Sequence, residues 1–389
     1  MAIHEYTLNA PVVFGAGAIG KIGEKVRSMG CKRAMCVCDE GVKNAGILDI
    51  VMSFLREAGI ETIVFDAVLP DPPSTIINDA GDLARKTGID CVIGIGGGSS
   101  MDTAKAVSIL QKHGGSITDY LNLQGPPFFV DGGVPVILAP TSAGTGSEVT
   151  NICVVSHVER NEKIVVLTNV SQAIVDPELC RTAPPDVTAN GGFDALSHAA
   201  EAITAKEWNP FSELLGLAAI RRIREYLPAA CKDGNDKRAR EELSLASNWA
   251  GIAFASTNVH VGHAATDSIS IIFHTPHGLN CAWVTPAVLE MCSETVPEKV
   301  KLIGEALGVV FIGNESTGEI GRIASEACRA LMRQCGIRPM ESYGLSREKV
   351  LSGANNMLSN GLCLNSPMEI TGATAEKLLA SAYDNYGSD

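Results

Sequence analysis

The first half of this 389-residue chain alternates short, uniformly apolar runs with longer segments whose apolar residues recur at helical spacing. We expect strands at 33–39, 61–68, 90–97 and 134–144. We expect helices at 43–59, 77–88 and 101–114. Strands without polar alternation are typical of a parallel sheet that is buried on both faces. The alternation therefore predicts an α/β domain with helices on both sides of a parallel sheet.

Beyond about residue 185 strand signals become rare and helical spacing dominates. Helices are expected at 193–206, 210–226, 236–255, 284–294, 297–308, 316–336, 346–359 and 373–383. Residues 182–192 (TAPPDVTANGG) are rich in Pro, Gly and Thr, which predicts a connection between the two patterns. We therefore expect an α/β domain of residues 1–185 and an all-helical domain of residues 186–389, since a chain of this length favours two domains.

Composition narrows the possible classes of function. Hydrophobic residues make up 46% and charged residues 19%, as in a globular protein. A net charge of −13 disfavours a nucleic-acid or anionic-membrane partner. The sequence has no apolar run near the roughly 20 residues of a membrane span and no signal-peptide pattern. Twelve scattered cysteines predict reduced thiols in the cytoplasm, and Cys36 and Cys38 favour buried packing over zinc binding.

Two glycine-rich loops follow predicted strands. The first, GIGGGSSMDTAKAV (94–107), leaves a strand and opens a helix, where backbone amides can hold a phosphate. Three consecutive glycines exceed what a tight turn requires, which favours phosphate binding over a simple turn. The second, PTSAGTGSEVT (140–150), also follows a strand. Both loops are therefore expected at the edge of the sheet where open α/β folds bind ligands.

Two further features upstream are less specific. Asp39 ends the first predicted strand, where a carboxylate suits a ribose 2′-hydroxyl, but it is equally suited to a turn before Glu40 and Gly41. FGAGAIG (14–20) matches GxGxxG without a clear strand-to-helix context or an acid about 20 residues further on. This second match is a weak indication of nucleotide binding.

The histidines are concentrated in one part of the chain. Five of the eight lie between residues 198 and 277, and four of these lie in HVGHAATDSISIIFHTPH (260–277). In FDALSHAAEA, Asp194 and His198 are one helical turn apart and can address one ion. His263 and His277, the latter in the loop-like TPHG, complete one carboxylate and three imidazoles. A lone buried histidine is usually a core residue, but a cluster favours a divalent-metal site suited to Fe²⁺ or Zn²⁺.

Four of these segments, GGGSSMDTAKAV, PTSAGTGSEVT, GFDALSHAAEA and HTPHGLN, together resemble the iron-containing (group III) alcohol dehydrogenases over nearly the whole chain. The resemblance implies an N-terminal dinucleotide-binding domain and an all-helical C-terminal domain. It assigns the metal ligands to Asp194, His198, His263 and His277. It assigns cofactor contacts to Gly97, Gly98, Ser99, Asp102, Thr141, Ser142, Thr145, Ser147 and Lys163, and places Asp39 where an acid favours NAD over NADP.

One position departs from the family pattern. Where the family commonly reads HxxxH, this chain reads HAATD, so that Asp267 replaces a histidine that lies near the nicotinamide in relatives. The proton relay is then expected to use Asp267, His260 or His274, or to pass through water. An acid beside the metal site could also select a polar or cationic substrate.

The resemblance implies hydride transfer between NAD(H) and a small alcohol or aldehyde, with aldehyde reduction as the expected direction and Fe²⁺ or Zn²⁺ as the metal. One alternative is a metal- and NAD-dependent lyase of the dehydroquinate synthase type, although the strongly basic pocket of such a lyase is not evident. A second is a non-catalytic, self-assembling scaffold. The expected partners are the substrate and further copies of the chain, in a homodimer or a larger homo-oligomer.

Overall fold

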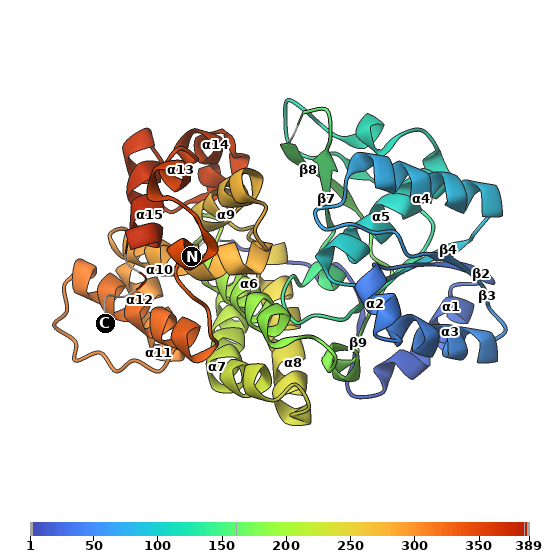
Figure 1. Ribbon diagram of the computed structural model, residues 1–389, viewed down its shortest axis with the longest axis horizontal. Helices are drawn as coiled ribbons and strands as arrows, with labels where there is room; N and C mark the ends of the chain where they lie inside the picture. Colours follow the sequence, from blue (N-terminus) through green and yellow to red (C-terminus); the bar gives the residue numbers. More distant parts are fainter. Residues whose placement is uncertain (1–2, 161, 385, 387–389) are drawn as a thin grey trace. The chain divides into compact units, whose positions relative to one another are not determined.

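The computed structural model describes residues 3–160, 162–384 and 386. The chain forms two compact units (Figure 1). One is the α/β unit, Leu8–Thr182, and the other is the helical unit, which joins the described residues of Met1–Thr7 to those of Ala183–Asp389. The first residues therefore group with the helices, which the sequence pattern does not indicate.

The α/β unit is built on a six-stranded parallel sheet with the order β1-β9-β6-β4-β2-β3. Its strands are β1 (Val12–Phe14), β2 (Arg33–Val37), β3 (Glu61–Phe65), β4 (Cys91–Gly96), β6 (Val136–Pro140) and β9 (Gln172–Val175). All six residues of the central strand β4 are buried, which explains why its sequence lacks polar alternation. The predicted parallel α/β fold is confirmed.

Helices cover both faces of this sheet. They are α1 (Ile22–Ser28), α2 (Glu40–Asn44), α3 (Ile47–Glu57), α4 (Ser74–Thr87) and α5 (Gly98–His113). Helices α1 and α3 contribute Ile22 and Val51 to a core cluster with Ile93 of β4. The next residue of β4, Gly94, points to the opposite face, where a Cβ would come within 2.8 Å of Ala104 in α5. Helix α5 thus packs directly on the strand that it follows.

A second, three-stranded sheet belongs to the same unit and was not predicted. It has the order β5-β8-β7, formed by β5 (Phe129–Val130), β7 (Ile152–His157) and β8 (Glu162–Thr168). Strands β7 and β8 are antiparallel. Cys153 and Val155 of β7 pack with Ile77 and Leu110 in a second core cluster. Strand β7 of this sheet therefore packs against helices α4 and α5.

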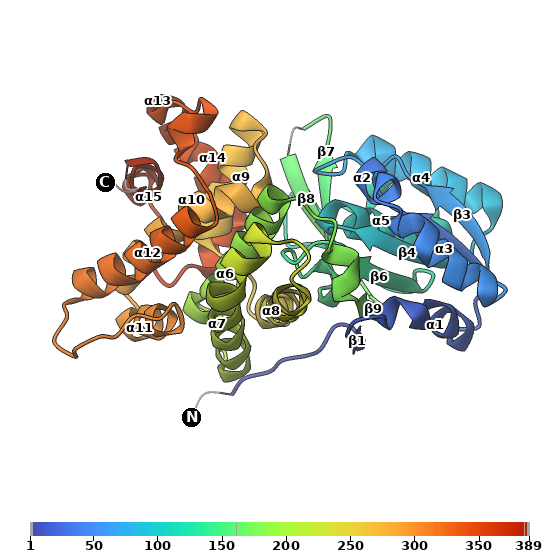
Figure 2. The same cartoon turned by 60° about the horizontal axis from the view of Figure 1, so that its bottom comes forward.

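The helical unit contains the remaining helices (Figure 2). They are α6 (Pro185–Thr204), α7 (Pro210–Lys232), α8 (Lys237–Ala255), α9 (Val261–Phe273), α10 (His277–Ser293), α11 (Pro297–Ala306), α12 (Thr317–Gln334), α13 (Arg347–Leu351), α14 (Ala354–Ser359) and α15 (Gly372–Asp384). No helix in the described part of the chain is long and apolar enough to span a membrane.

The prediction of a connection over residues 182–192 was wrong from Pro185 onward. Pro185 starts α6, and this position suits proline because its missing N–H has no partner in a first helical turn. Gly192 lies where a Cβ would come 2.4 Å from Leu227 of α7. These residues are therefore helix-start and close-packing residues rather than breakers.

The N-terminal segment packs on the helical unit through aromatic side chains. His4 meets Trp208 edge-on with ring centroids 5.4 Å apart, and Tyr6 stacks on Phe211 at 4.2 Å. Lys299 Nζ lies 3.4 Å from the centre of the Trp208 ring. We call the pairs His4–Trp208 and Tyr6–Phe211 the N-terminal clasp.

All twelve cysteines lie among the described residues, and all are free thiols. Cys36 and Cys38 are fully buried in the core of the α/β unit, as the prediction of packing rather than zinc binding requires.

Candidate active site

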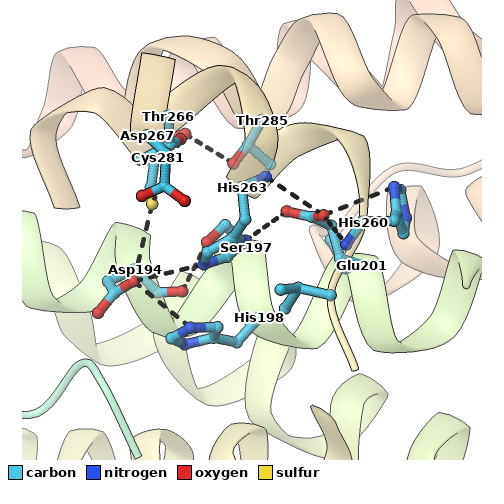
Figure 3. Close-up of polar contacts among 12 residues, drawn as sticks. Asp194, Ser197, His198, Glu201, His260, His263, Thr266, Asp267, Cys281 and Thr285 are labelled. Carbon is cyan, nitrogen blue, oxygen red and sulfur yellow. Dashed lines mark hydrogen bonds and ion pairs between the residues drawn. The ribbon is translucent and has the colours of Figure 1, made fainter. Parts of the chain in front are cut away.

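Three imidazoles converge on one carboxylate in the helical unit (Figure 3 shows Asp194, His198 and His263). Nε2 of His198 and Nε2 of His277 each lie 3.7 Å from Oδ1 of Asp194, and Nε2 of His263 lies 4.0 Å from it. Asp194, His198 and His263 are buried, whereas a third of the His277 side chain is exposed. The structure thus brings together the four residues that the sequence indicated, and the group opens to solvent beside His277.

Helix packing positions this cluster. Asp194 and His198 are one turn apart on α6, and His277 is the first residue of α10 rather than part of a loop as expected. A Cβ on Gly278 would come 2.1 Å from the Asn190 carbonyl oxygen of α6, so only glycine lets α10 start this close. His274 adopts a left-handed conformation with φ 54° and ends α9, which lets the chain turn into α10.

The residues present fit a divalent metal ion. The buried Nε2 of His263 has no hydrogen-bond partner among the described residues. One donor atom from each of Asp194, His263, His277 and Cys281 lies within 4.8 Å of all the others. Oxygen, imidazole nitrogen and sulfur together suit Fe²⁺ or Zn²⁺.

Cys281 is a possible donor that the sequence analysis missed, and it competes with His198. Its Sγ donates to Asp194 Oδ1 at 3.7 Å. Without a bound cation, burial and the nearby Asp194 carboxylate raise the pKa of this thiol well above its usual range, so a metal that binds the sulfur must displace a tightly held proton. Burial instead lowers the pKa of His198 to about 4, which leaves a neutral imidazole with a lone pair for a metal. We therefore retain His198 in the ligand set.

The sequence analysis also missed a second carboxylate, that of Glu201. It lies seven residues after Asp194 on the same face of α6, and this spacing is the signal that could have identified it. Glu201 Oε1 accepts a hydrogen bond from Nδ1 of His263 at 2.7 Å, and Oε2 accepts one from the backbone N–H of His260 at 2.6 Å. This contact keeps the His263 proton on Nδ1 and turns Nε2 toward Asp194, as carboxylates do behind metal-bound histidines.

The charges of this cluster favour a bound cation. Burial raises the pKa of Glu201, but His263 and His260 outweigh it and lower the value to about 2. For Asp194, burial is likewise outweighed by His198, His277 and His263, and its pKa is lowered. Burial lowers the pKa of His263, but the Glu201, Asp194 and Asp267 carboxylates together outweigh it and raise the value. A metal therefore displaces a proton from His263, and its affinity should fall with decreasing pH.

The three candidates for the proton relay occupy different environments. His260 is fully buried, and its Nε2 donates to Thr204 Oγ1 at 2.8 Å because that hydroxyl donates to the Ala200 carbonyl. This burial excludes direct contact between His260 and a substrate. His274 is exposed at the end of α9, and Asp267 has a side chain that is 20% exposed.

In the α/β unit the two glycine-rich loops lie side by side. Their strands, β4 and β6, are neighbours in the sheet, and Thr141 N–H donates to the Gly96 carbonyl at 3.0 Å. A Cβ on Gly98 would come within 3.0 Å of Thr145. Helix α5 starts at Gly98, so its free amides face outward from the carboxyl edge of the sheet, as the sequence indicated.

Asp102 and Ser147, two of the expected cofactor contacts, are buried and form hydrogen bonds within the protein. Ser147 Oγ donates to Asp102 Oδ1 at 2.7 Å, and the Val154 N–H donates to Asp102 Oδ2 at 3.0 Å. Lys105, which the sequence analysis did not single out, is fully buried, and its Nζ donates to Ser147 Oγ at 2.7 Å and to the Ile152 carbonyl at 2.6 Å. Asp102, Lys105 and Ser147 form a buried brace that ties α5 to the second loop.

We predict that Lys105→Met destabilises the α/β unit by about 3–5 kcal/mol, because it leaves the buried Asp102 carboxylate without its cation. Calorimetric unfolding measures this effect. Lys112→Met, which removes an exposed lysine from the same helix, is the matched control. Equal stabilities of the two variants would show that the brace does not hold the unit together.

Two further cofactor candidates, Asp39 and Lys163, come from outside the two glycine-rich loops. Asp39 caps α2, since its Oδ1 accepts from Val42 N–H at 2.9 Å, and its Oδ2 lies 3.5 Å from Ser100 Oγ of the first loop. Asp39 therefore caps a helix and also lies beside the first glycine-rich loop. This position is compatible with both the turn role and the ribose-binding role that the sequence suggests. Lys163, on β8, pairs with Asp71 at 2.8 Å.

The GxGxxG-like FGAGAIG turn has its amides occupied by the protein. The N–H groups of Gly17 and Ile19 donate to the Asp176 carboxylate at 3.1 and 3.0 Å. Gly15 and Gly17 have φ of 135° and 79°, which glycine adopts readily, so the turn itself accounts for these glycines without a nucleotide.

Fold and site together define a protein with a glycine-loop α/β unit and a helical unit that carries a candidate metal site. The family model described as "Iron-containing alcohol dehydrogenase" matches residues 9–177, and the C-terminal model of the same family matches residues 188–383. The chain belongs to the iron-containing alcohol dehydrogenase family. The predicted family is thereby confirmed, and with it the activity of an alcohol dehydrogenase or aldehyde reductase rather than a lyase or a scaffold.

Similar proteins carry several substrate names. The chain is 34% identical over 350 residues to a choline dehydrogenase of Bacillus subtilis, covering 89% of this chain and 87% of the relative. It is 35% identical over 299 residues to an NAD-dependent methanol dehydrogenase of Bacillus methanolicus, covering 76% and 78%. A crystal structure of 1,3-propanediol oxidoreductase superposes with a TM-score of 0.91 at 31% identity, covering 98% of this chain and all of that one.

Proposed function

We propose that this protein is an NAD- and metal-dependent alcohol dehydrogenase that reduces a small aldehyde. The observation that carries the proposal is the approach of three imidazole Nε2 atoms to within 4.0 Å of one oxygen of Asp194. Asp194, His198, His263 and His277 are the proposed ligands of Fe²⁺, with Zn²⁺ as the alternative. When bound, the metal supplies Lewis acidity toward the substrate oxygen and NAD(H) supplies the hydride chemistry.

The chain's own residues orient and shield this chemistry. Glu201 fixes the His263 ring from behind, and Phe254 stacks on the His198 ring at 4.2 Å, so the buried side of the cluster excludes water. His277 and Asp267 are the more exposed side chains of the group. A substrate is therefore expected to approach past them.

Several features support NAD as the cofactor. The outward-facing amides at the start of α5 suit a pyrophosphate. Asp39, beside that loop, suits a ribose hydroxyl and repels a 2′-phosphate. Gly97, Gly98, Ser99, Thr141, Ser142 and Thr145 are proposed as cofactor contacts, and Lys163 as a peripheral one. The methanol dehydrogenase relative is described as NAD-dependent.

We further propose that residues 1–185 carry the cofactor and residues 186–389 the metal, and that the chain works in the cytoplasm as a homodimer or larger homo-oligomer. Free cysteines throughout the described chain suit a reducing compartment.

The decisive experiment follows NADH and NADPH oxidation by the purified chain over a panel of small aldehydes. The protein is first stripped with a chelator and then reloaded with Fe²⁺ or Zn²⁺ separately. We expect activity to be lost on stripping, to return with the metal, and to favour NADH. Full activity in the stripped protein would refute the metal-dependent proposal, and a preference for NADPH would refute the role of Asp39.

A further inference from the structure

Asp267 lies on the solvent-accessible side of the candidate metal site. It lies one helical turn after His263 on α9, and its Oδ1 is 4.0 Å from Nδ1 of His277. Asn360, which follows α14, donates to its Oδ2 at 3.2 Å. The exposed fraction is 20% for the Asp267 side chain, against 6% for Asp194. One imidazole ring therefore separates this carboxylate from the proposed metal site, on the flank that solvent reaches.

The other nearby carboxylate that is not a proposed ligand has a different role. Glu201 is 2% exposed, and its oxygens are taken up by His263 and by the backbone of His260. It acts on the protein from behind the cluster. Asp267 also has protein partners, since Asn360 donates to its Oδ2, but its side chain is 20% exposed on the open side, where an approaching molecule meets it.

The carboxylate changes the charge that a substrate meets there. The family pattern leads one to expect an imidazole at this position, whereas Asp267 is an acceptor with a negative charge. An anionic group on a substrate is repelled at this flank, and a cationic group is attracted.

We propose that Asp267 is a specificity-determining residue that binds a substituted ammonium group on the alcohol or aldehyde substrate, with Asn360 holding the carboxylate in place. The proposal rests on the proposed function, because it names the substrate class of the same site. A cation is favoured over an uncharged group of the same shape because the carboxylate attracts a positive charge directly, even when that charge carries no N–H donor.

A pair of alcohols with the same shape and different charge tests the proposal. Choline carries a trimethylammonium group two carbons from its hydroxyl, and its neutral isostere carries a tert-butyl group there. For the metal-loaded enzyme with NAD we expect kcat/KM to be at least about tenfold higher for choline. Asp267→Asn should lower kcat/KM for choline by about 10- to 100-fold and change that for the isostere less than about threefold.

Two further measurements separate this role from others. Asp186→Asn removes an exposed acid from the same unit and controls for net charge, so its choline kinetics should match those of the unaltered enzyme. Calorimetric binding of choline to the metal-loaded enzyme without NAD needs no turnover, and Asp267→Asn should weaken it by a similar factor.

Equal kcat/KM values for the two alcohols in the unaltered enzyme would overturn the proposal. An equal loss of both in Asp267→Asn would also overturn it and would place Asp267 in the common chemistry instead. Failure of the proposed function is distinguishable, because the enzyme would then turn over no alcohol or aldehyde of any charge with either metal.

Discussion

Asp194→Asn is expected to release the metal and to lower turnover about a thousandfold. The carboxylate is the one atom group that all three imidazoles face, at 3.7, 3.7 and 4.0 Å, and it supplies the negative charge of the ligand set. Losing about 4 kcal/mol of transition-state stabilisation corresponds to this factor. Metal content after dialysis and the NADH oxidation rate measure the two effects.

The variant should still bind NADH, because the glycine-rich loops belong to the other unit. Asp186→Asn, on the exposed first turn of the same helix, should retain both metal and activity. If Asp194→Asn kept more than a tenth of the turnover, the carboxylate could not be an essential ligand.

Glu201→Gln is expected to weaken metal binding by about 10- to 100-fold while the four proposed ligands stay in place. An amide has one oxygen for two N–H donors, those of His263 Nδ1 and the His260 backbone, so its NH₂ group must face one of them. Competition with a chromophoric chelator measures the metal dissociation constant. Glu207→Gln, an exposed position just beyond α6, is the matched control.

The pH dependence of metal binding gives a second readout. Glu201 raises the pKa of His263, so in the unaltered protein a metal must displace a proton that is held more tightly than usual. Without that charge the pKa of His263 falls, and the pH at which affinity declines should move downward in Glu201→Gln. A dissociation constant within twofold of the unaltered value, with an unchanged pH profile, would contradict the role assigned to Glu201.

The parallel sheet and most helices were predictable because each is decided by local pattern. Strand β4, CVIGIG, is buried at every residue, and a short run without polar residues that ends at a glycine-rich loop is typical of a buried parallel strand. The N-terminus of α6 was not predictable from such rules. From the sequence alone, Pro185 and Gly192 are typical of a helix break. The reason for Gly192 is its close packing against Leu227, which is distant in sequence.

The four proposed metal ligands were predictable from residue type and spacing, whereas most of the residues that surround them were not. Asp194 and His198 are marked by an i,i+4 pair. Cys281 and Lys105 become meaningful only through tertiary contacts, such as those of the buried brace. The spacing of Glu201 from Asp194 marks the shared face of α6, but its 2.7 Å contact with His263 is known only from the fold. Asp102 and Ser147 show in addition that residues of a phosphate-type motif can hold the loop itself in place.

The N-terminal clasp means that the helical unit is discontinuous in sequence. A fragment that starts at Ala183 would lack the rings that His4 and Tyr6 place on Trp208 and Phe211, and would uncover both. Genetic dissection of the protein into its halves therefore needs two cuts, and circular permutation that joins the C-terminus to the N-terminal segment is the route to a contiguous helical half.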